Sequence, residues 1–312
     1  MSRVDIKEGQ FQRGFSAEKV LDPPLLPFLR WPGGKRWLSG VLREIASQVP
    51  YSRYVEPFLG GGSTFFALNP GRALLSDVNA NLIQVYRAVR ESPDEVERAL
   101  ERIPLGESAY YTVRGKAPRT DVNRAAQFIY LNRTSFSGIY RVNALGRFNV
   151  PYGGDRIPSD LIARKILTRA STRLSTATLC VCDFGQTIKM CGRGDFVYCD
   201  PTYTVSHNNN GFIRYNESNF AWSDQARLRG YATSAARRGA SVLISNAHHR
   251  QILKLYRGFP YAIVRRYSAL CPNTSHRGQR SEVLIWVSRD LPPPASGCTW
   301  KYYSGSERLH QL

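Results

Sequence analysis

Residues 53–68 read RYVEPFLGGGSTFFAL, and the fold class follows from this segment. RYVE is a short strand-like segment that ends in an acid, three glycines follow, and STFFAL then carries a helical pattern. Glycine lets the backbone approach a ligand closely and leaves the first N–H groups of a helix free to bind it. The segment therefore predicts a strand–turn–helix unit of an α/β sheet, with a ligand at the turn.

The same alternation continues along the chain. We expect further strands at residues 73–76, 178–182, 196–199, 241–245, 262–266 and 282–287, and further helices at residues 80–90, 224–238 and 250–256. Short apolar runs that alternate with helical patterns are typical of a parallel sheet in an α/β fold. The sequence therefore predicts one sheet built from most of the chain.

Residues 91–165 interrupt this alternation. Two helical patterns, near 94–102 and 122–132, precede a stretch rich in Gly, Asn and Arg that has the character of a hairpin. We therefore predict an inserted domain at 91–165 and a main domain made of 27–90 and 166–290. Residues 1–26 lack periodicity, which predicts a flexible arm. The tail, 291–312, begins with prolines and is expected to leave the core.

The composition favours a nucleic-acid partner. The 312 residues include 43 Lys and Arg against 24 Asp and Glu, a formal net charge of +19, and 12% of them are aromatic. The basic residues are spread along the chain instead of being confined to one tail, which is typical of nucleic-acid binding. The alternative is a well-solvated basic surface, because net charge alone says little about fold.

Cysteine and histidine spacing predicts no metal site. The six Cys form no CxxC pair and the five His form no HxH or HExxH spacing. Cys180, Cys182 and Cys199 lie in strand-like runs, so we expect reduced core thiols and not disulfides. The sequence shows no N-terminal signal and no run of 18 apolar residues, which predicts a soluble, cytoplasmic protein. We also expect a monomer.

Four consecutive expected strands end in an acid: Glu56, Asp77, Asp183 and Asp200. Ligands of open α/β sheets bind outside the carboxyl ends of the strands. Carboxylates gathered there repel one another unless a ligand supplies positive charge or donors, and S-adenosylmethionine supplies both. Each acid alone could instead cap the following helix. A dinucleotide site is the other alternative, but Phe65 occupies the third position of its G-x-G-x-x-G/A motif.

The segment at 196–203, FVYCDPTY, predicts chemistry on an exocyclic amine. The lone pair of adenine N6 is delocalised into the ring, so that nitrogen is a poor nucleophile. The Asp200 carboxylate and the Pro201 carbonyl could accept its hydrogens and favour a nucleophilic geometry, while the Tyr203 ring stacks on an extruded base. An ordinary turn at the end of a strand is the alternative, since Asp-Pro is common in turns.

Six ordered blocks now give the chain a specific resemblance. They are FLRWPGGKRWL (28–38), YVEPFLGGGSTFF (54–66), SDVNANLIQVY (76–86), LNRTSFSGIYRVNALGRFNVPYG (131–153), CDF (182–184), and WSDQARL with VLISN (222–228 and 242–246). Together with DPTY they resemble the Dam-type, D12-class DNA adenine-N6 methyltransferases over most of 27–290. The resemblance implies a Rossmann-like S-adenosylmethionine-dependent methyltransferase sheet with an inserted, mainly helical DNA-recognition domain at 91–165.

The resemblance also implies roles for individual residues. Catalysis falls to Asp200, Pro201 and Tyr203, and duplex DNA is the expected partner. S-adenosylmethionine contacts fall to Trp31, Lys35, Glu56, Phe58, Gly60, Gly62, Asp77, Asp183, Phe184 and Asp200. DNA contacts fall to Arg133, Phe136, Ile139, Arg141, Asn143, Asn149 and Pro151.

The recognition stretch suits base reading on its own chemistry. Arg133, Arg141 and Arg147 alternate with Asn132, Asn143 and Asn149. Arg can bind the acceptor edge of guanine and Asn the edge of adenine. A solvated basic hairpin whose Asn side chains only form turns is the alternative.

The chain departs from the family pattern at two places. Thr202 stands where the family usually has a second proline, so one ring constraint on the loop is absent. Gly154-Asp155-Arg156 replaces a basic-aromatic hairpin, so the sequence does not predict GATC as the recognition site. An RNA or protein methyltransferase and a catalytically silent DNA-binding homologue remain the alternative functions.

Overall fold

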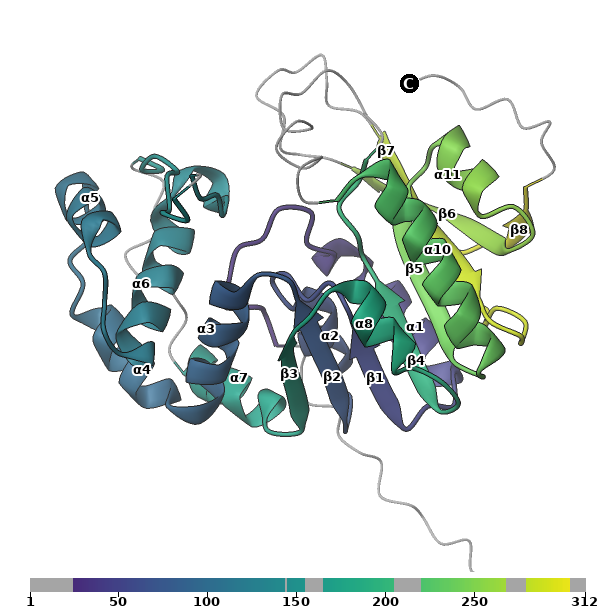
Figure 1. Ribbon diagram of the computed structural model, residues 1–312, viewed down its shortest axis with the longest axis horizontal. Coiled ribbons are helices and arrows are strands. Elements are labelled where there is room, and N and C mark those ends of the chain that lie inside the picture. The colour runs from purple at the N-terminus through teal and green to yellow at the C-terminus, as the bar shows by residue number, and fades with distance from the viewer. Residues whose placement is uncertain (1–24, 144, 155–164, 205–219, 268–278, 304–312) are drawn as a thin grey trace, which may run out of the picture.

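The computed structural model describes residues 25–143, 145–154, 165–204, 220–267 and 279–303. Its centre is one twisted sheet with helices packed around it (Figure 1). The strands are β1 (Arg53–Glu56), β2 (Ala73–Asp77), β3 (Ala177–Val181), β4 (Asp195–Cys199), β5 (Ser241–Ala247), β6 (Pro260–Tyr267), β7 (Gln279–Val287) and β8 (Lys301–Tyr302).

The strand order is β3-β2-β1-β4-β5-β7-β6-β8. The first five of these strands are parallel, whereas β7 pairs antiparallel with both β5 and β6, and β8 pairs antiparallel with β6. The sequence prediction of a parallel sheet therefore holds for β1 to β5 and was wrong for the last strands. Apolar periodicity identifies a strand but carries no information about its direction.

Side chains of the central strands alternate between two helical layers. On β4, Phe196 and Tyr198 belong to one buried cluster and Val197 and Cys199 to another. This is the two-residue periodicity of an extended chain. Helices α8 (Phe184–Lys189), α10 (Trp222–Arg237) and α11 (Arg250–Leu255) cover the second face. On the first face lie α1 (Ser39–Gln48), α2 (Ser63–Leu68), α3 (Ala80–Glu91) and α7 (Ile166–Leu174).

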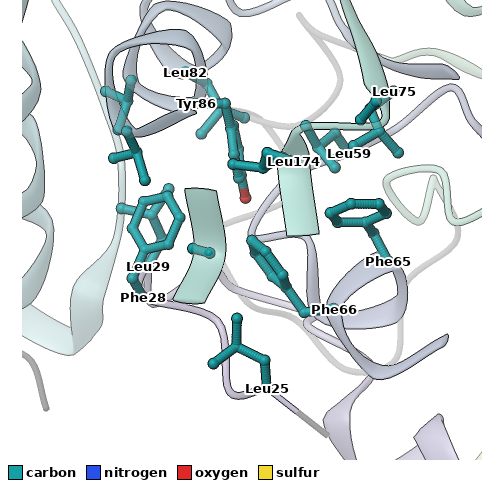
Figure 2. Packing of buried hydrophobic residues seen from close by; sticks show 14 of the residues in the cluster. Leu25, Phe28, Leu29, Leu59, Phe65, Phe66, Leu75, Leu82, Tyr86 and Leu174 are labelled. Atoms are coloured by element: carbon teal, nitrogen blue, oxygen red, sulfur yellow. The ribbon is translucent and has the colours of Figure 1, made fainter. Parts of the chain in front are cut away.

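The first helical layer is dense in aromatic residues. Tyr86 of α3 packs edge-on against Phe28, with ring centroids 5.4 Å apart, and lies beside Phe66 of α2 (Figure 2). Leu25 joins this cluster with only 3% of its surface exposed. The arm expected at 1–26 therefore does not extend as far as Leu25, and its residues 1–24 lie outside the described part of the chain.

Residues 91–165 add helices beyond the β3 edge of the sheet, at the left of Figure 1. They are α4 (Pro93–Glu101), α5 (Glu107–Gly115) and α6 (Asp121–Thr134). Their buried residues, including Val96, Tyr110 and Ile129, belong to the same cluster as those of α3 and α7. The segment thus shares its core with the sheet's first helical layer. No helix in the described part of the chain is long and apolar enough to cross a membrane.

The C-terminal tail does not leave the core, so that prediction was wrong for its described part. Trp300 packs against the first cluster, and its indole N–H donates to the carbonyl of Pro293 at 2.9 Å. Ser296 donates its backbone N–H to Glu44 of α1 at 2.9 Å, and β8 adds an edge to the sheet. The three prolines, 292–294, therefore form a connection, and Trp300, which follows them, holds this connection against the core.

The cysteine prediction was wrong at two of three positions. Cys180 and Cys182 form a disulfide, whereas Cys199 and Cys191 are buried free thiols. Cys180 lies on β3 and Cys182 directly follows that strand, and their Cα atoms lie 5.6 Å apart, within the span of a disulfide. The apolar, strand-like sequence around all three cysteines therefore did not distinguish the disulfide-bonded Cys180 and Cys182 from the free Cys199.

The packing predicts a contrast between two leucines. Leu174 of α7 is fully buried and Leu291 is 83% exposed. Leu174→Ala should lower the free energy of unfolding by about 2–5 kcal/mol, because it leaves a cavity in the core. Leu291→Ala should change it by less than about 0.5 kcal/mol. Equilibrium unfolding in urea measures both, and equal effects would contradict the described packing.

Candidate active site

The four sequence-predicted carboxylates lie along one rim of the sheet. Asp183, Asp77, Glu56 and Asp200 follow or end β3, β2, β1 and β4, which are neighbours in that order and all parallel. The chain leaves β1 toward β2 on one side, while β4 lies on the other. The topological switch point is therefore between Glu56 and Asp200, where open α/β sheets bind their ligands.

The glycine-rich turn lies under Trp31. Gly60 and Gly62 have φ angles of +48° and +67°, which favour glycine. A Cβ on Gly60 would lie 2.8 Å from Trp31 Cδ1, and a Cβ on Gly62 would lie 2.8 Å from the Tyr86 hydroxyl. That hydroxyl donates to the Gly60 carbonyl at 3.0 Å. Glycine is thus required at both positions, because φ is positive and because Trp31 or Tyr86 leaves no room for a Cβ.

Asp77 is tied to the same turn. Its Oδ2 accepts the Gly60 N–H at 3.0 Å and its Oδ1 accepts the Asn79 N–H at 2.9 Å. Burial raises the pKa of Asp77, and these backbone donors oppose the rise. The carboxylate therefore both shapes the turn and keeps further lone pairs for a ligand.

Glu56 lies deeper, behind the rim. It is 3% exposed, and its Oε2 accepts the Tyr54 hydroxyl at 2.9 Å. Burial raises the pKa of Glu56 well above its ordinary value, and the nearby Asp200 and Asp77 charges add to the rise. Burial and like charge together disfavour the ionised form of Glu56, and a cationic ligand would favour it.

Asp183 caps a helix, which was the alternative role considered for each of the four acids. It is the N-cap of α8, where its Oδ1 accepts the Gly185 N–H at 2.9 Å, and it pairs with Arg227 at 3.0 Å. Phe184 is buried and stacks on Phe58, with ring centroids 5.2 Å apart. These side chains form one wall of the site, and their contact with a cofactor stays a prediction.

Asp200 is held from two sides at one oxygen. Its Oδ1 accepts from Ser245 Oγ at 2.7 Å and lies 3.0 Å from Lys35 Nζ. Tyr198 donates in turn to Ser245 Oγ at 3.0 Å. Among the described residues, Ser245 and Lys35 both reach the same oxygen, Oδ1, of Asp200. Burial raises the pKa of Asp200, and the Lys35 charge opposes the rise.

Lys35 is a buried cation with three acceptors for its three N–H groups. Its Nζ reaches the Gly33 carbonyl at 3.0 Å, Asp200 Oδ1 at 3.0 Å and Glu282 Oε2 at 3.4 Å. Burial alone would lower the pKa of Lys35, but the two carboxylates outweigh it and raise the pKa. The ammonium thus stays charged beside Asp200, and a direct contact between Lys35 and a cofactor stays a prediction.

The rest of the catalytic segment combines buried and exposed residues. Pro201 is buried, Thr202 is exposed, and the Tyr203 hydroxyl donates to Glu282 Oε2 at 2.7 Å. Glu282 and Ser245 were not among the predicted site residues. The sequence signal for Glu282 was an acid inside the strongly apolar strand at 282–287. The structure explains this acid, because β7 runs antiparallel and brings Glu282 to the rim.

The recognition stretch forms the expected hairpin. Asn143 donates its backbone N–H to Arg147 at 2.8 Å, and Val142 pairs with Phe148. Arg141 and Asn149 hold each other, because Arg141 Nε donates to Asn149 Oδ1 at 2.8 Å on an exposed face. Asn143 Oδ1 accepts the N–H groups of Leu145 and Arg147, so this side chain shapes the turn.

Other predicted DNA-binding residues differ in exposure. Phe136 is 56% exposed, Pro151 and Arg141 are exposed, and Ile139 is half-buried. Asn132 is fully buried and exchanges hydrogen bonds with the Arg30 backbone at 2.7 and 2.8 Å. Its interpretation as a base reader was therefore wrong, because it joins α6 to the N-terminal segment.

Arg133 lies in a cluster of positive charge. Burial, with the nearby Arg30 and Arg36 charges, lowers its pKa to about 10. Tyr140 of the hairpin stacks between Trp31 and Phe128, at centroid distances of 5.9 and 4.8 Å. The hairpin and the glycine-rich turn therefore share one aromatic stack.

Comparison with known proteins assigns the family. The sequence profile of the D12 class N6 adenine-specific DNA methyltransferases matches residues 31–269. The chain belongs to this family. It is 31% identical to the Type II methyltransferase M1.LlaDCHI of Lactococcus lactis subsp. cremoris, over 84% of this chain and 95% of that protein. It is 32% identical to a DNA adenine methylase of Vibrio cholerae, over 86% and 98%.

A third relative is larger. The DNA N-6-adenine-methyltransferase of Escherichia phage P1 is 35% identical over 82% of this chain, which spans 34% of that protein. The α/β sheet and the family together confirm the fold class expected of this D12-class chain, a Rossmann-like methyltransferase sheet.

The rim of this D12-class site fits a cationic, hydroxyl-bearing cofactor. Burial raises the pKa values of Glu56 and Asp77 although hydroxyl and backbone donors oppose the rise, and the glycine turn lies directly beside Asp77. Among the described residues, no group of three or more His, Cys, Asp or Glu is arranged to hold a metal ion.

Gly60→Ala should weaken S-adenosylmethionine binding by about tenfold. The new Cβ would contact Trp31, and a left-handed conformation costs a non-glycine residue about 1–2 kcal/mol. Gly71→Ala is the matched control, because nothing lies within 4 Å of a Cβ there. Titration calorimetry measures both dissociation constants, and an unchanged value for Gly60→Ala would remove the glycine turn from the cofactor site.

Proposed function

We propose that this chain is an active, site-specific methyltransferase that uses S-adenosylmethionine to methylate N6 of an extruded adenine in duplex DNA. The main support for this proposal is the set of contacts that Asp200 makes at the switch point. Two buried donors, Ser245 and Lys35, hold its Oδ1, and buried Pro201 and then Tyr203 follow it closely in the chain. One fixed carboxylate, one carbonyl and one ring match the needs of the adenine amine.

The chain's own groups account for the chemical step. S-adenosylmethionine, when bound, supplies an electrophilic methyl group on sulfonium. Asp200 and the Pro201 carbonyl would accept the two N6 hydrogens and draw the nitrogen lone pair out of the ring. As the new N–C bond forms, the methyl–sulfur bond would break and the sulfur would leave as a neutral thioether. N6 becomes positive and would pass a proton to the Asp200 carboxylate. Its charge therefore acts most strongly in the transition state.

The basic surfaces support duplex DNA as the partner. Arg114, Lys116, Arg124 and Arg147 line a cavity of about 490 Å³ between α3, α6 and the hairpin, and none of the described lining residues is a carboxylate. Arg133, Arg30 and Arg36 form the second cationic cluster. Phosphate contacts of this kind position a duplex, while Arg141, Asn149 and their neighbours on the hairpin would read bases.

Sequencing methylated DNA tests the function directly. DNA from a host without adenine methylation, after expression of the chain, should carry N6-methyladenine within one short sequence. Purified protein should methylate a duplex containing that sequence and not an RNA of the same sequence. Methylation of the RNA alone would replace the proposal with an RNA methyltransferase.

Asp200→Ala should abolish methyl transfer while cofactor and DNA still bind, because the carboxylate acts chiefly in the transition state. A single-turnover assay with labelled methyl groups measures the loss, and calorimetry measures binding. Asp290→Ala removes an exposed carboxylate away from the rim and is the control. Residual transfer near the wild-type rate would contradict the assignment of Asp200.

Arg141→Ala should reduce discrimination at one base pair by about 1–3 kcal/mol, since its guanidinium would read a base edge. Arg98→Ala, on the exposed face of α4, should leave discrimination unchanged. Competition binding with the cognate duplex and single-base variants separates the two. If Arg141→Ala weakens all duplexes equally, the side chain contacts phosphate.

A further inference from the structure

Glu282 is a second buried carboxylate beside the proposed catalytic acid. It lies near the N-terminal end of β7, pairs in register with Ala247 of β5 and Val264 of β6, and is 5% exposed. Since β7 runs antiparallel to the central strands, this end of β7 lies at the rim where the parallel strands finish. Its Oε2 accepts the Tyr203 hydroxyl at 2.7 Å and lies 3.4 Å from Lys35 Nζ.

We propose that Glu282 is a positioning residue for base capture, which holds the Tyr203 ring and the Lys35 ammonium so that the stacking face and the amine acceptor keep one relative geometry. The inference rests on the proposed function, because it assigns Glu282 to the same adenine site. Glu282 is not placed in contact with the base, and its effect passes through Tyr203 and Lys35.

The first argument concerns the Tyr203 ring. A stacking ring serves best when its plane is fixed before the base arrives, since fixing it later costs free energy. Tyr203 is half-buried, and its hydroxyl donates to a charged acceptor, which is a strong hydrogen bond. Burial raises the pKa of Tyr203 well above its ordinary value, with Asp200 and Glu282 adding to the rise, so the hydroxyl stays a donor.

The second argument concerns Lys35. Its ammonium bridges Glu282 and Asp200 and lies 4.9 Å from the centroid of the Tyr203 ring. The four side chains therefore form one unit, in which two carboxylates share one cation. The remaining negative charge suits an adenine that becomes positive as N6 is methylated. Loss of Glu282 would free the ring and release one of three restraints on Lys35.

The charges also predict a pH effect. Among the described residues, the charged and titratable groups that act at Asp200 and Glu282 include Lys35, Tyr198, Tyr203 and Glu56. Burial raises the pKa of Asp200, Lys35 and Ser245 oppose the rise, and the Glu282 charge adds to it. Glu282→Gln removes that negative charge, so the pKa of Asp200 falls. The acidic limb of kcat/KM should therefore move to lower pH.

The experiment compares Glu282→Gln, Glu282→Ala, Tyr203→Phe and the double variant Glu282→Ala/Tyr203→Phe. Glu95→Gln, at an exposed position of α4, is the matched control. The substrate is a duplex with the methylated site found by sequencing, either fully paired or mismatched opposite the target adenine. A third duplex carries 2-aminopurine at the target, whose fluorescence reports extrusion. Circular dichroism establishes that each variant is folded.

Glu282→Gln and Glu282→Ala should slow single turnover on the paired duplex by about tenfold or more, with less 2-aminopurine fluorescence. Cofactor affinity should stay within about twofold of wild type. The mismatch should restore most of the rate, because extrusion then costs less. In the Tyr203→Phe background, the loss of Glu282 should cost less than in the wild type.

Wild-type rates for Glu282→Gln and Glu282→Ala would overturn the inference. A structural role would also overturn it. The rate losses would then be additive with the loss from Tyr203→Phe, a mismatch would not restore the rate, and the pH profile would not move. Should Glu282→Ala fail to fold, Glu282→Gln carries the test. A wild-type chain that leaves duplex adenine unmethylated overturns the proposed function itself, whereas an active chain indifferent to Glu282 overturns this inference alone.

Discussion

The Lys35 ammonium is buried, and a buried cation must have compensating charge and acceptors. Its acceptors come from three places: its own turn at Gly33, the end of β4 at Asp200 and the start of β7 at Glu282. Removing either carboxylate would take away one of the three acceptors of the buried ammonium. The N-terminal segment, the fourth strand and the antiparallel strand must therefore meet at one point, and the catalytic segment is built around that point.

The sheet topology makes this meeting possible. The switch between β1 and β4 gathers four acids on one rim, and the reversal of β7 brings a fifth to the same side. The strands hold the acids, whereas Trp31 packs closely on the glycine turn that Asp77 holds. The recognition hairpin is coupled to this region through the aromatic stack at Tyr140. Cofactor side and DNA side are thus parts of one packed structure.

Several polar residues of the site serve the scaffold as well as the ligand. Asp183 caps a helix, Asp77 holds the glycine turn, and Asn143 shapes the hairpin. Asn132 serves the scaffold alone, since it is fully buried. Polar groups near a binding site must satisfy their hydrogen bonds in the folded protein before any ligand arrives. The position of a residue in a motif therefore predicts where its side chain lies. Its hydrogen-bond partners in the folded protein decide which of its donors and acceptors can still bind a ligand.

The sequence by itself determined strands β1 to β7, the acids at the strand ends and the DPTY segment, because periodicity and turn residues are local properties. It also predicted α2, α3, α4, α6, α10 and α11 but not β8, α1, α5, α7 or α8. It also determined the family, through the order of its motifs. Only the tertiary structure decided the direction of β7, the docking of the tail at Trp300 and the partners of Lys35, Asp200 and Tyr203. Each of these depends on residues distant in the chain, and strand direction and side-chain pairing leave no periodic signal in the sequence.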